Sequence, residues 1–153
     1  MVDLVYNEAK LQMWSGNILI LTDPIKVMLV TPDYIPDPDH TYVDDGTELS
    51  PVNFELDGTG YVAGFGSSDR LTLENRSLVR DDNTDRIRLF ADPVDWNPIS
   101  AGVAGAYIIM KEVTSDAESP LIAYVSSGGF PINTDGGELV ITFNATNGVI
   151  TLA

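Results

Sequence analysis

The amino-acid sequence predicts an all-β protein: a β-sandwich or small barrel of about seven or more short antiparallel strands, with a short N-terminal helix and a long acidic loop. Three observations support this class. Short apolar runs of strand length recur from residue 61 onward, turn residues separate them at regular intervals, and only one segment is typical of a helix. With 153 residues there is room for one hydrophobic core. We expect a single β domain over 1–153, with an N-terminal arm (1–24), the acidic loop (32–60) and a β core (61–153).

The first predicted element is a short helix over residues 8–15. Asn7 is a favourable N-cap, and Gly16 is typical of the residue that ends a helix in the left-handed region. Leu11 and Trp14 lie three residues apart and therefore share one face. Because so short a helix is unstable alone, we expect it to dock on the rest of the chain.

Residues 25–31 form a β-rich run that stops at Pro32, so a strand is expected there. The following residues, 32–60, contain several prolines, many acids and few apolar side chains, which indicates a loop. Loops of this length are often mobile or functional.

Further strands are predicted downstream. Residues 70–80 and 85–91 are expected to form a hairpin whose turn is residues 81–84, because apolar and polar side chains alternate in the second segment. Two more apolar runs, 104–113 and 121–126, flank a polar turn region.

The C-terminal residues carry a strong local turn signal. Asn147 and Gly148 are the preferred pair for a two-residue type I′ hairpin, and this turn would place Phe143 opposite Leu152. The same register gathers the apolar side chains on one face, so a hairpin of 139–146 with 149–152 is expected.

The charge is strongly negative: 23 acidic against 8 basic residues give −15. Such a chain is a poor candidate for binding nucleic acid or an anionic membrane surface, both of which need positive charge. Residues 33–57 contain acids and no Lys or Arg, whereas most basic residues fall between Arg70 and Arg88. The two stretches either complement each other, within or between subunits, or are separately solvated; the second alternative is slightly favoured.

No catalytic, cofactor or metal site is predicted. The single histidine, His40, lies in the acidic loop, and the absence of a Gly-x-Ser-x-Gly motif favours a solvated histidine over a catalytic triad. With no cysteine there is no thiolate or zinc–sulfur site. Asp81, Asn83 and Asp85 imitate part of a calcium loop, but Arg86 stands where its glycine belongs, so a turn is favoured. We therefore expect no enzyme activity.

Protein binding is the function class that remains. The candidate contact residues are bulky or basic side chains, most of them near turns: Met13, Trp14, Tyr34, Trp96, Phe130, Arg70, Arg86 and Arg88. Aromatic side chains at such places are frequent interface hot spots, although they more often cover the ends of the fold.

Several segments resemble the small structural proteins encoded among the head genes of tailed bacteriophages. These are residues 6–11, 25–30, 58–61, 119–124, 128–131 and 136–137. The resemblance extends over nearly the whole chain and carries over no functional residue. It implies a virion protein made in the bacterial cytoplasm, a capsid decoration (cement) protein on the capsid exterior. The implied partners are the major capsid protein and further copies of the chain, commonly as a trimer.

Two other functions stay open. Tail, baseplate and head–tail connector proteins are also small, β-rich and free of cysteine. A carbohydrate-binding module on the virion is the second, with Trp14, Trp96 and Tyr34 as side chains that would stack on sugar rings.

Overall fold

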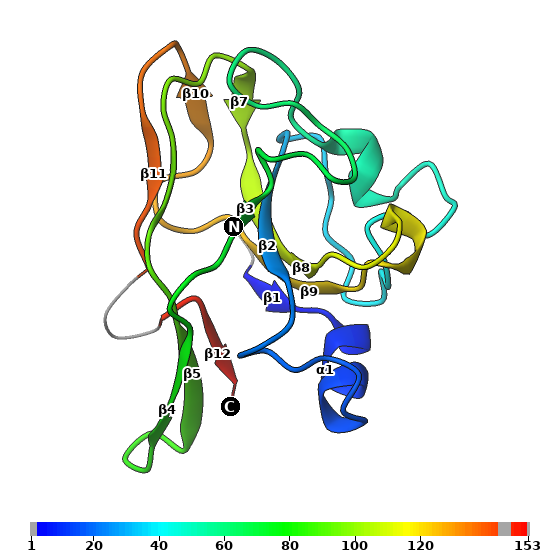
Figure 1. Ribbon diagram of the computed structural model, residues 1–153, viewed down its shortest axis with the longest axis vertical. Coiled ribbons are helices and arrows are strands. Elements are labelled where there is room, and N and C mark those ends of the chain that lie inside the picture. The colour runs from blue at the N-terminus through cyan, green and yellow to red at the C-terminus, as the bar shows by residue number, and fades with distance from the viewer. Residues whose placement is uncertain (1–2, 144–147, 153) are drawn as a thin grey trace.

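The computed structural model describes residues 3–143 and 148–152, which are mostly β with one short helix (Figure 1). Within those residues there are twelve strands, and every strand pair is antiparallel. They are β1 Leu4–Val5, β2 Ile25–Val30, β3 Leu71–Thr72, β4 Ser77–Asp81, β5 Arg86–Phe90, β6 Val94–Trp96, β7 Gly102–Ala104, β8 Ala106–Lys111, β9 Leu121–Val125, β10 Ile132–Thr134, β11 Leu139–Ile141 and β12 Ile150–Leu152. The all-β class is confirmed, whereas the choice between a sandwich and a barrel stays a prediction.

The largest sheet has the order β1-β9-β8-β2-β3. Strand β2 pairs with β8 along its whole length, from Ile25 opposite Lys111 to Val30 opposite Ala106. Apart from half-buried Lys26, every residue of β2 is buried, with successive side chains entering two different clusters. Because both faces are covered, the sequence of β2 is a continuous apolar run.

Three small sheets cover one face of the large sheet. They are β10-β7, β11-β6 and β12-β5-β4 (Figure 1). Their inward side chains, among them Leu89, Trp96 and Leu139, form one cluster with Val27 and Ile109 of the large sheet. The main hydrophobic core therefore lies between the large sheet and the small ones.

The acidic loop covers the other face. Tyr34 and Val43 from this loop are buried against Met28 and Ile108. The backbone of the loop bridges to the sheet at Glu55, opposite Val30, and a 3-10 turn (η1, Pro51–Phe54) lies just before this point. Residues 32–60 are thus a loop, as predicted, but one whose buried side chains complete the core.

The helix α1 spans Asn7–Trp14 and confirms the predicted element. Two details differ. Asn7 is its first residue and donates its side-chain amide to Asp39 at 2.7 Å, so it does not cap the helix. The helix docks through buried Ala9, whereas Leu11 and Trp14 are 63% and 93% exposed.

The predicted hairpin of 70–80 with 85–91 is confirmed in part, as β4 and β5 (Ser77–Asp81 and Arg86–Phe90). Its first strand begins at Ser77, because Leu71 and Thr72 form β3 and pair with β2 of the large sheet. Asp81 lies opposite Arg86, so residues 82–85 make the turn. The Asp81 carboxylate accepts hydrogen bonds from the backbone N–H of Asn83, at 3.0 Å, and from the hydroxyl of Thr84, at 2.7 Å. These bonds stabilise the turn, which lies one residue later than the predicted 81–84 because Asp81 is still paired in the strand.

The predicted C-terminal hairpin is wrong in its pairing. Strand β11 pairs with β6, and β12 pairs with β5, so the partner of Leu152 is Ile87 and not Phe143. Residues 144–147, which comprise the end of the expected first strand and Asn147 of the expected turn, lie outside the described residues. Gly148 passes so close to β5 that a Cβ atom would sit 2.2 Å from the carbonyl oxygen of Leu89. Pairing with β5 buries Ile150, and this burial accounts for the partner that β12 takes.

Candidate functional site

Of the predicted contact residues, Trp14 is the most exposed. Its side chain lies on the last turn of α1 and is 93% accessible. Met13 beside it is half-buried and packs against the main core. Arg86 is exposed, and Arg88 is half-buried in an ion pair with Asp81. These four residues remain available at or near the surface.

Three predicted contact aromatics are inside the protein. Tyr34 contacts Phe54 and Tyr124. Trp96 donates its indole N–H to the carbonyl oxygen of Asp69 at 2.7 Å. Phe130 packs against Tyr107 with ring centroids 5.8 Å apart.

The prediction that these three aromatics lie on a contact surface is therefore corrected. Trp96 and Tyr34 are each 3% exposed, and Phe130 is 6% exposed. The neighbouring prolines and glycines indicated turns correctly, but a turn residue can still direct its side chain inward.

Arg70 is also buried, at the centre of a cluster of carboxylates. It makes two hydrogen bonds to Glu55, at 2.8 and 2.7 Å, and two to Asp116, at 2.6 and 3.2 Å. The hydroxyl of Tyr61 donates to Glu55 at 3.0 Å and accepts from the backbone N–H of Leu29 at 3.0 Å. The cluster ties the acidic loop to β2 and to the 3-10 turn Asp116–Glu118.

The charges of this cluster change the acid–base properties of its members. Burial alone would lower the pKa of Arg70, but the hydrogen bonds and charges of Glu55 and Asp116 raise it above its usual value. Burial, followed by the charge of Glu55, raises the pKa of Tyr61 well above 10. Arg70 is therefore a permanent internal cation, and its predicted role as a surface contact is corrected.

This cluster bears on the predicted complementarity of acidic and basic segments. Arg70 pairs with Glu55 of the acidic loop, so one such contact exists within the chain. Arg80 and Arg88 instead pair with Asp82 and Asp81 of their own hairpin. The other arginines of the segment are thus left near the surface at the β4–β5 end of the molecule.

A groove of about 560 Å³ opens beside this hairpin, and we call it the apolar groove. One wall is the segment 18–22, and the other is the face of the β4–β5–β12 sheet. Its lining residues are aliphatic or Met except for one threonine: Met13, Ile18, Leu19, Ile20, Leu21, Thr22, Leu78, Ile87, Leu89, Ile150 and Leu152. The alternation of apolar and polar residues in β5 indicated an apolar sheet face from the sequence alone. No local pattern indicated that residues 18–22 form the second wall.

The strand register explains why the sheet wall is apolar. Leu78, Leu89 and Ile150 lie opposite one another in a row across the three strands. Ile87 lies between Leu152 and Arg80 in the next row, nearer the hairpin tip. In the row near the core, Leu89 and Ile150 are buried, but Leu78 is 47% exposed. Ile87 in the next row is also 47% exposed.

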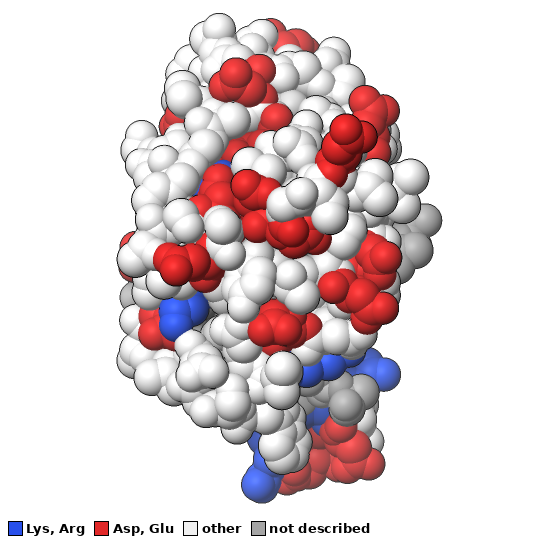
Figure 2. Space-filling model, turned by 90° about the vertical axis from the view of Figure 1, so that its right-hand side faces the viewer, with Lys and Arg blue, Asp and Glu red and all other residues white. Residues whose placement is uncertain are grey.

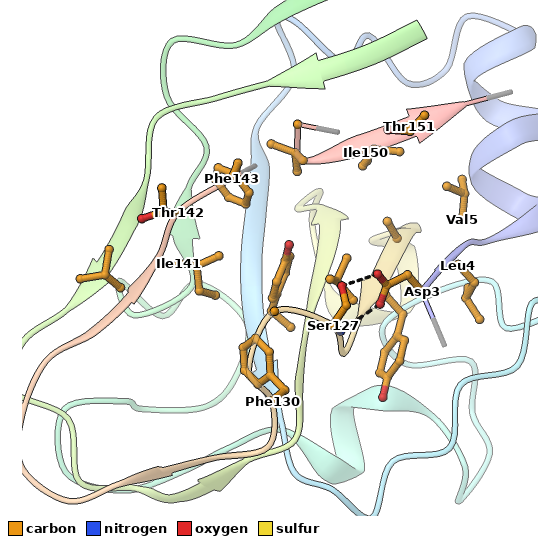
Figure 3. Close-up of a pocket in the computed structure, with 18 of the residues that line it drawn as sticks. Asp3, Leu4, Val5, Ser127, Phe130, Ile141, Thr142, Phe143, Ile150 and Thr151 are labelled. Carbon is orange, nitrogen blue, oxygen red and sulfur yellow. Dashed lines mark hydrogen bonds between the residues drawn. The ribbon is translucent and has the colours of Figure 1, made fainter. Parts of the chain in front are cut away.

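A second cavity, of about 580 Å³, lies near β1, β9 and β12 (Figure 3). Phe130, Ile141 and Phe143 line it on one side, and Ile150 and Thr151 line it on another. Its wall includes Phe143 and Gly148, which flank residues outside the described part of the chain.

The polar groups of this cavity are held by the fold itself. The Asp3 carboxylate accepts hydrogen bonds from the backbone N–H groups of Ser126 and Ser127, at 2.9 and 3.0 Å, and from the Ser127 hydroxyl. Burial and the charge of Asp3 raise the pKa of Tyr107 above its usual value. Asp3 therefore fixes the turn after β9 rather than facing the cavity as an unpaired acid.

His40 is not a freely solvated histidine, which corrects the prediction. It is half-buried, and its Nδ1 lies 2.9 Å from the hydroxyl of Tyr34, which in turn lies 2.9 Å from the hydroxyl of Tyr6. The buried hydroxyl of Ser50 donates to Asp45 rather than to His40. This geometry does not place a base beside a serine nucleophile.

Two further searches cover only the described part of the chain. No group of three or more His, Cys, Asp or Glu side chains there is arranged to hold a metal ion. No helix there is long and apolar enough to cross a membrane.

Comparisons with known proteins found no matching family model, no similar curated protein and no similar solved structure.

The acidic loop gives a pH prediction through Asp45. Burial acts to raise the pKa of Asp45, but hydrogen bonds from Ser50 and Thr47 lower it below its usual value. The unfolded chain therefore binds a proton at Asp45 at a higher pH than the folded chain does. We expect Asp45 to add stability above about pH 4, and this contribution to be lost as the pH falls further, through the lowered pKa.

The check is thermal unfolding between pH 7 and pH 3 for the wild type and for Asp45→Asn. The variant should be less stable at neutral pH and lose less stability on acidification. Equal slopes for the two proteins would contradict the assignment.

Proposed function

We propose that this chain is a non-enzymatic structural protein that acts by binding other protein subunits, as a capsid decoration protein on the outer face of a tailed-phage head. The observation that most supports protein binding is the concentration of exposed apolar side chains at one end of the molecule. Leu78 and Ile87 of the apolar groove are each about half exposed, and Met13 of α1, the sequence neighbour of exposed Trp14, also lines the groove. Contiguous exposed apolar surface on a soluble protein usually marks an interaction site.

The phage-head role rests on the sequence resemblance and agrees with the charge. A net charge of −15 keeps an abundant surface protein soluble and repels it from packaged DNA. On a symmetric shell, many identical contacts add up, so a modest surface on each copy is sufficient.

Counting copies of the chain in purified phage particles tests this proposal. Quantitative mass spectrometry against the major capsid protein should give hundreds of copies per particle, and mild treatment should release them without opening the head. A count of roughly six or twelve, the size of one closed ring, would assign the chain to the tail or connector instead. Absence from the particle would overturn the virion role.

The carbohydrate-binding alternative has lost most of its basis. It required Trp14, Trp96 and Tyr34 to stack on sugar rings, and two of these side chains are buried.

A further inference from the structure

Strand β4 (Ser77–Asp81) is an uncovered edge of its sheet. It lies at the end of the order β12-β5-β4 and pairs with β5. Its first four residues are all exposed, and two of them, Leu78 and Val79, are apolar. Among the strands that the structure describes, the other edge strands have two or three residues, whereas β4 has five. Short edge strands protect a protein against pairing with other chains, and β4 lacks this protection.

The hairpin of β4 and β5 carries no net charge, although the whole chain is at −15. Residues 77–90 contain three arginines and three aspartates. In Figure 2, acidic atoms are spread over the visible face, whereas basic and acidic atoms lie together at the lower end, where β4 and β5 lie in Figure 1. A second copy of the chain therefore meets less like charge at this hairpin than over the acidic loop.

We propose that the β4 strands of two copies pair antiparallel across a two-fold axis at Val79. The strand of the second copy supplies partners for the backbone N–H and C=O groups that an edge strand leaves free. This contact goes beyond the proposed function and does not depend on the virion role. Because it is two-fold, it also differs from the trimer that the sequence resemblance implies.

The register of two identical antiparallel strands is restricted by symmetry and by charge. Residues opposite one another lie on the same face of a sheet, so the axis passes through a residue position and not between two residues. An axis at Leu78 would place Arg76 opposite Arg80 of the second copy, and an axis at Arg80 would oppose two arginines directly. An axis at Val79 opposes no like charges, and it is the register that pairs all five residues of β4.

The side chains that this register brings together are compatible. On the face away from the apolar groove, Val79 meets Val79 of the second copy, and the Ser77 hydroxyl lies opposite the Asp81 carboxylate. On the groove face, Leu78 lies opposite Arg80 of the second copy, whose aliphatic stem covers part of the exposed leucine. The contact therefore combines backbone hydrogen bonds with apolar cross-strand pairs.

Pairing at β4 would join two three-stranded sheets into one sheet of six strands. The two-fold axis is perpendicular to this sheet, so the apolar grooves of both copies open on the same face. The dimer would present them side by side, as a symmetric pair of apolar surfaces.

A single cysteine tests the register directly, because the chain has none of its own. Across the proposed axis, the two Cα atoms of Val79→Cys would lie about 4.5–5.5 Å apart, within the range that a disulfide spans. With oxidised glutathione as the oxidant, this variant should form covalent dimers on non-reducing electrophoresis.

Two further single cysteines are the controls. Leu78→Cys lies on the same strand, but its thiols would be diagonal neighbours about 7–8 Å apart, too far for an unstrained disulfide. Val103→Cys lies on another exposed strand residue. Both should cross-link at least about tenfold more slowly than Val79→Cys; equal rates for the three variants would overturn the register.

Charge exchange at Val79 tests the contact without a covalent bond. Sedimentation velocity up to about 1 mM chain suits a contact of this small size. The wild type should form dimers, and Val79→Glu and Val79→Lys should each raise the dissociation constant about tenfold, because like charges then face each other across the axis. An equimolar mixture of the two variants should dimerise at least as tightly as the wild type, because opposite charges then meet.

The controls are Val103→Glu and Val103→Lys, which make the same changes at a strand residue of similar exposure. They should dimerise like the wild type, and circular dichroism checks that every variant keeps its fold. A monomeric wild type, or a mixture of the Val79 variants that associates no better than either alone, would overturn the β4 contact. Neither result changes the number of copies on a particle, so this proposal and the proposed function can fail separately.

Discussion

Replacing Arg70 with methionine should lower the free energy of unfolding by about 3–5 kcal/mol. The Arg70 side chain is fully buried, and Glu55 and Asp116, which it neutralises, are 1% and 13% exposed. Methionine fills much of the same volume but leaves these carboxylates inside the protein without a cation. The cost of that uncompensated charge dominates the effect. Urea unfolding at pH 7, followed by circular dichroism, measures it.

A matched variant separates the buried charge from arginine chemistry in general. Arg80 pairs with Asp82 on the exposed hairpin, so Arg80→Met should change stability by no more than about 0.5 kcal/mol. Glu55→Gln combined with Arg70→Met should cost less than the sum of the two single changes, because each removes the same ion pair. Equal losses for Arg70→Met and Arg80→Met would show that the cluster does not anchor the acidic loop.

Replacing Gly60 with alanine should destabilise the protein by about 3 kcal/mol. Gly60 has φ +82°, and a Cβ atom there would lie 2.1 Å from the carbonyl oxygen of Pro98 and 2.9 Å from the Cα of Ile99. The neighbouring Thr59 bridges to Ser100 through the backbone, so the two segments cannot move apart without losing this bridge. Backbone strain and steric overlap therefore add.

Gly46 provides the control for this variant. Its φ is +81°, almost identical to that of Gly60, but no atom lies within 4 Å of the position that a Cβ would take. Gly46→Ala should therefore report the dihedral cost alone, about 1 kcal/mol. If chemical denaturation gives the same loss for both variants, close approach to Pro98 contributes nothing.

The parts of the fold that were predictable are those determined by local sequence. The continuous apolar run of β2 and its stop at Pro32 define a strand buried on both faces. The turn at residues 82–85 is stabilised by Asp81 within the same few residues. Gly16, with φ +81°, ends the helix as its residue type indicates. Each of these features depends on neighbours in the sequence.

The parts that were not predictable depend on distant segments. The choice of β5 as the partner of β12 is made by burial of Ile150 against Leu89, which no local turn preference reveals. The burial of Arg70 requires two distant carboxylates to reach its side chain: Glu55, which precedes it in the sequence, and Asp116, which follows it. The apolar groove lies between residues 18–22 and a sheet that includes β12, the last described strand. The sequence shows which of these residues are apolar, but it does not show that the two segments lie side by side.

The pairing of strands also determines how the chain must fold. Ile25 pairs with Lys111, Leu4 with Tyr124 and Ile87 with Leu152, so these ladders form only after long stretches of chain have been brought together. The chain loses conformational entropy when those loops close, and this loss occurs before most of the stabilising contacts have formed. The folding rate is therefore limited by topology, and the β4–β5 hairpin is the ladder best placed to form early.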